Sequence, residues 1–122
     1  MSEKSIHEKI FIDIDNSCQG MFIIGKNVDN PILLFLHGGP GMPTLFLEEK
    51  YPSGVEELFT VCYWEQTGGG ISFDPKLPPE SVTVDRIVSD VIEITKYLLK
   101  RFNREKIYLM GHSWGSLIGV MA

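Results

Sequence analysis

The sequence predicts an α/β fold in which an opening β-hairpin leads into a mostly parallel sheet with a crossover helix. Three short apolar runs, at residues 32–36, 60–64 and 107–110, are too short for helices. Their composition is that of strands buried on both faces, as in a parallel sheet. A long amphipathic segment separates the second run from the third, and strand, crossover helix and strand together make a βαβ unit.

The opening hairpin is predicted from alternation. Residues 10–15 alternate apolar and acidic side chains from Phe11 onward, which is typical of a half-buried strand. Residues 21–25 form a second apolar run, and the Asn-Ser-Cys-Gln-Gly sequence at residues 16–20 is expected to form the turn. The residues before this hairpin, including His7, are expected to be a polar leader.

The crossover helix is predicted at residues 83–102, where apolar side chains recur every three or four residues and charged ones fill the other face. Thr83 is a suitable N-cap, and Asn103 is placed to end the helix. Residues 68–79 are dense in turn formers and predict a loop. Residues 40–54 predict another loop, with a short helical turn around 45–50. A last helix is expected to begin at Trp114.

Composition limits the class of protein. A chain of 122 residues with 43% hydrophobic and 22% charged content fits one globular domain. A net charge of −5 argues against nucleic acid or an anionic membrane as the main partner. Two cysteines and no apolar segment of membrane-spanning length favour a cytoplasmic location. No metal-ligand spacing, phosphate loop or dinucleotide fingerprint occurs, so we expect no metal and no cofactor.

The sequence Gly-His-Ser-Trp-Gly at residues 111–115 matches the G-x-S-x-G pattern of a nucleophile elbow. It follows an apolar strand and opens a helix, which is the context that this motif requires. A serine on so tight a turn has its hydroxyl lifted clear of the sheet, and the glycines on either side let neighbouring backbones approach closely. The other interpretation is an ordinary turn between a strand and a helix.

A second motif, His-Gly-Gly-Pro-Gly at residues 37–41, directly follows the strand predicted at 32–36. Its glycines permit a turn whose amide donors point outward, as an oxyanion hole needs, and its proline stiffens the turn. A plain Gly-Pro loop is the alternative interpretation.

Together and in this order, the two motifs resemble the α/β-hydrolase fold, and more narrowly the proline iminopeptidase branch of serine peptidases. The resemblance covers nearly the whole chain. It implies that Ser113 is the nucleophile and that the backbone N–H groups of Gly39 and Trp114 form the oxyanion hole. It also implies that the surrounding residues of the first motif support this loop, namely His37, Gly38, Pro40 and Gly41.

The family stretch Asp-Gln-Arg-Gly-x-Gly-x-Ser stands here at residues 65–72 as Glu-Gln-Thr-Gly-Gly-Gly-Ile-Ser. Glu65 replaces the aspartate, and Thr67 replaces the arginine. Without the five-donor guanidinium, the loop that this arginine would pin must be held in another way. His112, before the serine, is the commoner hydrolase residue, whereas the aminopeptidase branch often has glycine there.

A serine nucleophile needs a base and an acid, and in this fold both follow the serine in the chain. The residues after Ser113 include neither an acid nor a histidine. Of the three histidines, His112 adjoins the nucleophile and is expected to pack, His37 to bond backbone, and His7 to lie in the leader. We therefore expect residues 1–122 to be the incomplete N-terminal part of a single α/β-hydrolase domain, completed by its missing C-terminal part or by a complementing chain.

The sequence thus predicts a serine hydrolase that cleaves an amide or ester through an acyl-enzyme on Ser113, acting on a small-molecule or peptide substrate. An aminopeptidase of the proline iminopeptidase type is the favoured subclass, and the 122 residues alone are expected to be inactive. Two alternatives stay open. One is an esterase or lipase-like enzyme of the same fold, and the other is a non-catalytic, truncated binding module.

Overall fold

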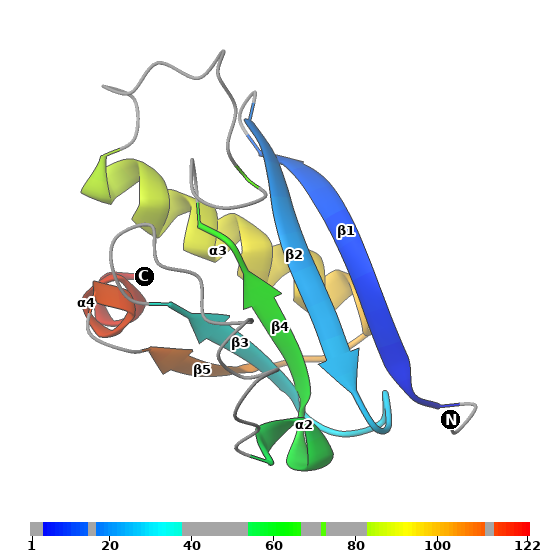
Figure 1. The fold of residues 1–122 in the computed structure, drawn as a ribbon. Coiled ribbons are helices and arrows are strands. Elements are labelled where there is room, and N and C mark those ends of the chain that lie inside the picture. The colour runs from blue at the N-terminus through cyan, green and yellow to red at the C-terminus, as the bar shows by residue number, and fades with distance from the viewer. Residues whose placement is uncertain (1–3, 15–16, 38–53, 67–71, 73–82, 112–113) are drawn as a thin grey trace.

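The computed structural model describes residues 4–14, 17–37, 54–66, 72, 83–111 and 114–122. Its five strands form one mixed sheet in the order β1-β2-β4-β3-β5, as Figure 1 shows. This arrangement confirms the predicted α/β class. The strands are β1 (Ile6–Ile14), β2 (Ser17–Gly25), β3 (Ile32–Leu36), β4 (Thr60–Trp64) and β5 (Tyr108–Gly111), and the helices are α2 (Val55–Leu58), α3 (Val84–Arg101) and α4 (Trp114–Met121).

The opening hairpin is longer than predicted, and the turn predicted at residues 16–20 is wrong. β1 and β2 pair antiparallel from Ile6 with Gly25 to Ile14 with Ser17, so residues 17–20 belong to β2. His7 likewise lies in β1 and not in a leader. The polar residues were misleading because they are buried in the strand: Gln19, for example, is 1% exposed and hydrogen-bonded within the core.

The central strands lie where the sequence predicts them. β3 pairs in parallel with β4 on one side and with β5 on the other, with Leu36 opposite both Trp64 and Gly111. β2 runs antiparallel to β4 and joins the hairpin to the parallel part of the sheet. Because β5 lies beside β3 and not beside β4, the connection through α3 crosses over β3.

α3 confirms the predicted crossover helix. The Thr83 side chain accepts a hydrogen bond from the backbone N–H of Arg86 at 3.1 Å, which is an N-cap. At the other end Asn103 has a φ of 52°, in the left-handed region that asparagine tolerates after a helix. α2 was not predicted, because its four residues are too few to show a helical period. The turn predicted around residues 45–50 lies outside the described residues, as does nearly all of the loop predicted at 68–79.

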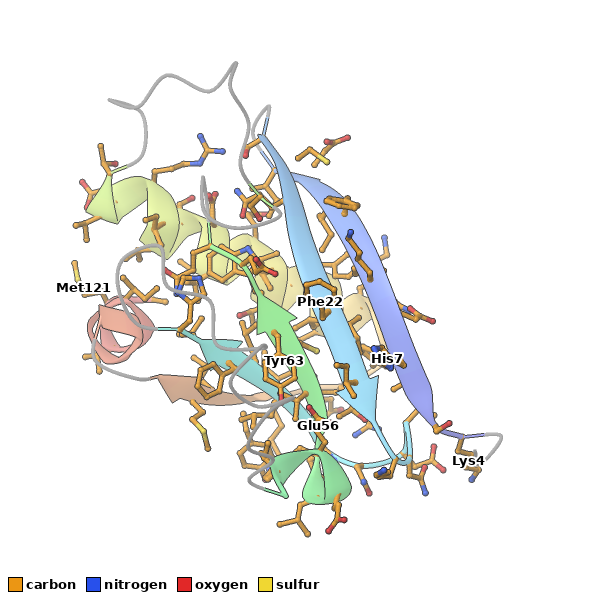
Figure 2. The ribbon with its side chains drawn as sticks, in the orientation of Figure 1. Lys4, His7, Phe22, Glu56, Tyr63 and Met121 are labelled. Atoms are coloured by element: carbon orange, nitrogen blue, oxygen red, sulfur yellow. The ribbon has the colours of Figure 1, made fainter. Side chains whose placement is uncertain are left out.

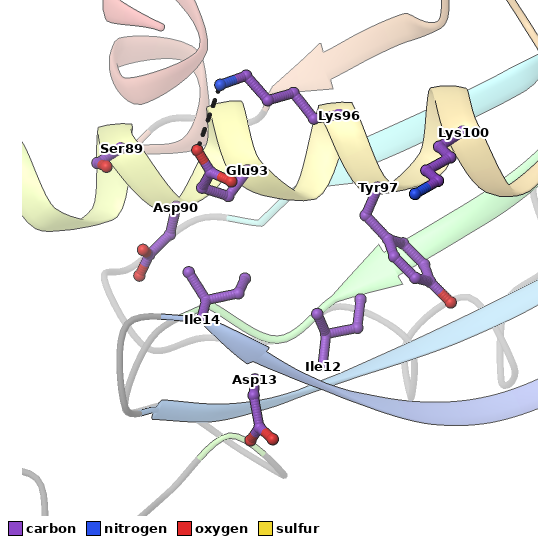
Figure 3. Close-up of a pocket in the computed structure, with 9 residues that line it drawn as sticks. All are labelled: Ile12, Asp13, Ile14, Ser89, Asp90, Glu93, Lys96, Tyr97 and Lys100. Atoms are coloured by element: carbon purple, nitrogen blue, oxygen red, sulfur yellow. Dashed lines mark hydrogen bonds and ion pairs between the residues drawn. The ribbon is translucent and has the colours of Figure 1, made fainter.

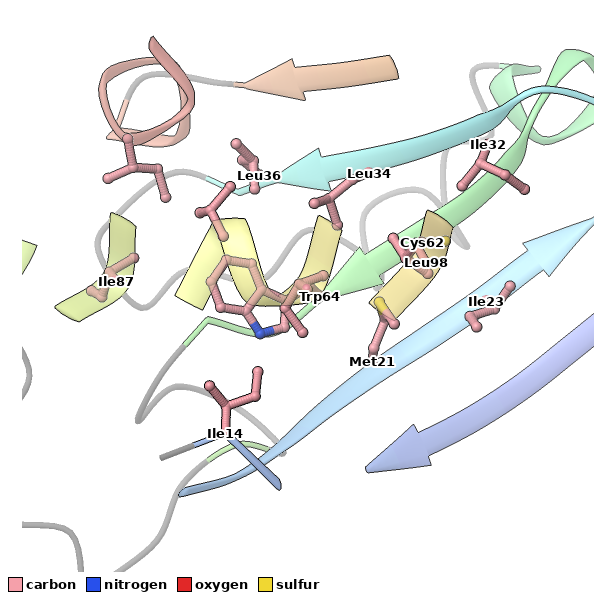
Figure 4. Close-up of a cluster of buried hydrophobic side chains, with 13 residues drawn as sticks. Ile14, Met21, Ile23, Ile32, Leu34, Leu36, Cys62, Trp64, Ile87 and Leu98 are labelled. Carbon is pink, nitrogen blue, oxygen red and sulfur yellow. The ribbon is translucent and has the colours of Figure 1, made fainter. Parts of the chain in front are cut away.

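The core lies mainly between the sheet and the two helices α3 and α4, which cover one of its faces (Figure 4). Alternate residues of β3 point to it, while Leu33 packs on the opposite face with Val61 and Tyr63. This period of two is what a strand buried on both faces requires. The cluster under α3 and α4 comprises Ile14, Met21, Ile23, Ile32, Leu34, Leu36, Cys62, Trp64, Ile87, Val91, Ile94, Leu98 and Ile118.

β5 corrects the expectation of burial on both faces. Tyr108, Leu109 and Met110 are 44–48% exposed, although their apolar composition matches that of the buried strands. Within the described sheet β5 is an edge strand that pairs with β3 alone. Composition therefore predicted the strand correctly but not its surroundings.

A buried polar network fastens α3 to the hairpin and to β4. Arg86 Nε donates to both carboxylate oxygens of Asp90 at 3.0 and 3.1 Å, and its Nη2 donates to the Ile14 carbonyl at 2.9 Å. Gln19 donates to Asp90 at 2.8 Å and accepts from the Trp64 indole N–H at 2.9 Å. These donors replace the water that a carboxylate with only 1% exposure has lost.

The two cysteines are free thiols in different surroundings, Cys18 exposed and Cys62 buried. Burial raises the pKa of the Cys62 thiol to about 12, so it stays protonated at physiological pH. Cys62 is therefore a packing residue and not a nucleophile. Across the described parts of the chain, no helix combines the length and the apolar character needed to cross a bilayer.

We predict that Asp90→Ala lowers the free energy of unfolding by about 3 to 5 kcal/mol, because it leaves the partly buried Arg86 guanidinium and the buried Gln19 amide without their carboxylate acceptor. Denaturant unfolding of the whole protein measures this change. The matched control is Glu93→Ala on the same helix, which removes an exposed ion pair with Lys96 (3.4 Å) and should cost no more than about 1 kcal/mol. Equal effects of the two substitutions would contradict a structural role for the network.

Candidate active site

The ends of β3 and β5 bring the two sequence motifs to the same edge of the sheet. Leu36 and Gly111 are partners in the parallel pairing, so the strands that precede the two motifs end at neighbouring positions. The carboxyl edge of a parallel sheet is where active sites of open α/β folds lie. Ser113, His112 and the motif residues Gly38, Gly39, Pro40 and Gly41 themselves lie outside the described residues.

Gly115 packs the beginning of α4 directly against the end of β3. A Cβ atom at this position would lie 1.9 Å from the Leu36 carbonyl oxygen and 2.9 Å from the His37 carbonyl oxygen. No side chain fits into such a space, so this helix can approach the strand only with glycine there. The close approach that the G-x-S-x-G motif predicts is therefore present at its last glycine.

The residue after the proposed nucleophile opens α4. The first N–H groups of a helix have no intrahelical acceptor, and they form the positive end of the helix dipole. The Trp114 amide belongs to this first turn, since α4 begins at Trp114. Its position suits a donor to a developing oxyanion.

His37 is buried and bonded to the backbone. It is 1% exposed, and its Nε2 accepts a hydrogen bond from the backbone N–H of Gln66 at 3.0 Å. An accepting nitrogen carries no proton, so the imidazole is neutral with its proton on Nδ1. This bond occupies the ring nitrogen that a general base would use, and His37 therefore serves the structure of the strand end.

Glu65 and Ser72, at the two ends of the stretch that lacks the family arginine, are hydrogen-bonded to each other and to Gly20. The Ser72 hydroxyl donates to the Glu65 carbonyl and accepts from the backbone N–H of Gly20 at 2.8 Å. The Glu65 N–H donates to the Gly20 carbonyl at 3.1 Å. Both ends of the stretch at 65–72 are thus tied to β2. Thr67 lies outside the described residues.

Sequence reasoning assigned no role to Gln66 or Ser72, although both stand in the family stretch at 65–72. A signal for Gln66 was present: parallel strands that end at residues 36 and 64 place the next residues of each chain segment side by side. Ser72 had no such signal, because its partners belong to β2 and to a loop of irregular backbone.

His7 and the acidic residues of α2 lie away from the ends of β3 and β5. His7 is near the start of β1, beside Ile24, far from α4 in Figure 2. Glu56 lies in α2, before β4 begins, where its carboxylate accepts from the Tyr63 hydroxyl at 2.7 Å. Glu57 is exposed on the same helix. Within the described residues no cluster of three or more acidic, histidine or cysteine side chains could hold a metal ion.

A groove of about 520 Å³ lies between β1 and α3 (Figure 3). β1 is the edge strand opposite to β5 in the described sheet. Ile12 and Ile14 line the groove together with the charged side chains of Asp13, Glu93 and Lys100. Among the described residues of the two motifs, His37, Gly111, Trp114 and Gly115, none lines it.

The family model of the α/β hydrolase fold matches residues 31–122, three quarters of the chain. The chain belongs to the α/β-hydrolase fold family. Its matching segment contains β3, β4, α3, β5 and α4, the elements that carry both motifs. The predicted fold class is therefore confirmed.

Relatives place this α/β-hydrolase chain near the proline iminopeptidase branch, as the sequence predicted. A probable aminopeptidase of Bacillus subtilis (strain 168) is 41% identical over 118 residues, covering 97% of this chain and 37% of the relative. A proline iminopeptidase of Lactobacillus helveticus is 28% identical over 99 residues, 81% of this chain and 32% of the relative. A proline iminopeptidase-related protein of Thermus thermophilus superposes with a TM-score of 0.75 at 28% identity, covering 95% of this chain and 39% of that protein. The chain thus spans between 32% and 39% of the length of these proteins.

We predict that Gly115→Ala lowers the free energy of unfolding by about 3 kcal/mol, because the added Cβ must push α4 away from two backbone carbonyls. Thermal and denaturant unfolding of the whole protein test this. Gly119→Ala is the matched control on the same helix: its Cβ would meet only the end of the Leu36 side chain at 3.1 Å, and alanine favours a helix. Its effect should stay within about 1 kcal/mol, and a Gly115→Ala protein as stable as this control would contradict the tight packing.

Proposed function

We propose that this α/β-hydrolase chain is the nucleophile-bearing part of a serine hydrolase that cleaves amides or esters through an acyl-enzyme on Ser113. The observation that carries the proposal is the pairing of Leu36 with Gly111. Together with the contact of Gly115 on Leu36, it brings the glycine-rich motif and the serine motif to one edge of the sheet. An acyl transfer enzyme needs this juxtaposition, because its nucleophile and its oxyanion donors act on one carbonyl group.

The proposed reaction proceeds in two acyl transfers. The Ser113 hydroxyl adds to the substrate carbonyl carbon while a base takes its proton. The resulting oxyanion is held by the N–H groups of Gly39 and Trp114. The carbon–nitrogen or carbon–oxygen bond then breaks, and the leaving group takes the proton from the base. Water, deprotonated by the same base, hydrolyses the acyl-enzyme and regenerates the serine.

For the substrate we propose the N-terminal residue of a peptide. The names of the relatives, probable aminopeptidase and proline iminopeptidase, support this class. An ester substrate is the competing proposal, favoured by His112 in place of the glycine that is common before the serine in the aminopeptidase branch. Pocket residues beyond the described elements would decide between the two.

We further propose that a complementing segment, the C-terminal part of the domain or a second chain, covers β5 and supplies the triad acid and histidine. Tyr108, Leu109 and Met110 form an apolar edge with 44–48% exposure, and Val120 of α4 is 87% exposed beside it. Unpaired apolar edges promote aggregation unless they are covered. The Bacillus subtilis relative is long enough to contain such a segment, since this chain covers only 37% of it.

We predict that a fluorophosphonate labels Ser113 in the whole protein, because an assembled triad makes this hydroxyl nucleophilic. Intact mass and peptide mapping measure the adduct. Ser113→Ala should abolish labelling, whereas the control Ser116→Ala should retain it. Whole, folded protein that stays unlabelled would overturn the hydrolase proposal. Parallel assays with a prolyl anilide and a short-chain nitrophenyl ester then separate the aminopeptidase from the esterase.

We also predict that residues 1–122 expressed alone are insoluble or molten, because the edge of β5 stays uncovered. Circular dichroism, dye binding to apolar surface and a thermal melt measure this state. Adding the exposed-edge substitution Leu109→Lys should improve solubility without restoring fluorophosphonate labelling. A sharp cooperative melt of the isolated monomer would show that the edge needs no cover.

A further inference from the structure

Gln66, which follows β4, donates two hydrogen bonds to His37, which follows β3. The backbone N–H of Gln66 donates to His37 Nε2 at 3.0 Å, and the side-chain amide of Gln66 donates to the His37 carbonyl at 3.0 Å. Both residues are buried, at 2% and 1% exposure. Each bond therefore lies in a place where water cannot replace it, and the pair fixes the two strand ends against each other.

The His37 carbonyl also faces the beginning of α4. Its oxygen lies 2.9 Å from the place that a Cβ on Gly115 would take. The same peptide group is thus held by the Gln66 amide while it abuts the helix that Trp114 opens. Because a peptide unit is planar, fixing the carbonyl of residue 37 fixes the plane in which the chain enters the glycine-rich motif.

We propose that Gln66 is a positioning residue for the oxyanion motif, acting through its two hydrogen bonds with His37. The inference rests on the proposed function, since it assigns Gln66 the task of setting the first peptide plane of that motif relative to the Trp114 amide. The bond from the Gln66 amide holds the His37 carbonyl, which belongs to this first peptide plane. Gln66 touches no reacting atom in this role.

A positioning role and a purely structural role of Gln66 predict different changes in kcat, KM and the fraction of active protein. A displaced donor weakens binding of the transition state more than binding of the substrate, so kcat falls while KM stays nearly constant. A displacement of the order of 1 Å costs about 100-fold in rate. A residue that only stabilises the fold lowers the fraction of active protein instead, and leaves each folded molecule as fast as before.

The test compares Gln66→Met with Gln19→Leu in the whole protein. Gln66→Met keeps a flexible side chain of similar length and the backbone N–H, but loses the donor to the His37 carbonyl. Gln19→Leu is the matched control, since it also removes a buried glutamine amide, whose partners Asp90 and Trp64 do not belong to the motif. Gln66→Asn serves as a second variant that retains an amide but is one methylene too short.

The measurements are the rate constant of fluorophosphonate labelling at Ser113 and the fraction of protein labelled at the end point. They also include kcat and KM for the prolyl anilide or the nitrophenyl ester, whichever the wild-type protein cleaves faster. We expect Gln66→Met and Gln66→Asn to lower the rate constant and kcat about 10- to 100-fold, with KM changed less than about threefold and complete labelling at the end point. Gln19→Leu should lower the melting temperature but keep the wild-type rate constant in the folded fraction.

The outcomes distinguish this inference from the function on which it rests. Wild-type protein that is not labelled at Ser113 overturns the proposed function, and this inference with it. Labelled wild type with equally fast Gln66 variants overturns the inference alone. The inference alone is also overturned if the Gln66 variants show a smaller labelled fraction or a lower melting temperature with an unchanged labelling rate constant. That result assigns Gln66 a structural role. Variants that do not fold at all also overturn it.

Discussion

The close approach of α4 to β3 is the constraint on which the rest of the site depends. The helix begins against the Leu36 and His37 carbonyls, at a separation that only a glycine at position 115 permits. This contact fixes where the first turn of the helix lies relative to the strand from which the glycine-rich motif departs. The parallel pairing of β3 with β5, the crossover of α3 and the glycine in the serine motif all serve to bring these two backbones together.

Much of the fold could be predicted because its signals are local. The unbroken apolar run of β3 and the helical period of α3, with Thr83 and Asn103 at its ends, lie within the sequence window of each element. The errors arose where a residue's surroundings come from distant parts of the chain. The polar start of β2 suggested a turn, yet Gln19 is satisfied by Asp90 from α3, 71 residues away. The apolar composition of β5 could not reveal that it lies at an edge.

The candidate site shows the same difference between features with a local sequence signal and contacts between distant parts of the chain. Motifs locate the proposed nucleophile and oxyanion donors, because tight turns impose their requirements on consecutive residues. The bonds beside the first motif are not local: His37, at the end of β3, accepts from Gln66, which follows the neighbouring strand β4, and Ser72 joins Glu65 to β2. That Thr67 replaces the arginine of the family pattern was evident from the sequence. That a serine hydroxyl and a glutamine amide hold the neighbouring backbone required the positions of the strands.

The order of the strands has a consequence for synthesis on the ribosome. β5 is placed beside β3, and the intervening chain must first form β4 and then cross the sheet as α3. The antiparallel hairpin and the pairs that β4 makes with β2 and β3 can therefore form while the serine turn is still within the exit tunnel. β5, which leads into the serine motif, is then added to the edge of a β3 strand that is already paired with β4.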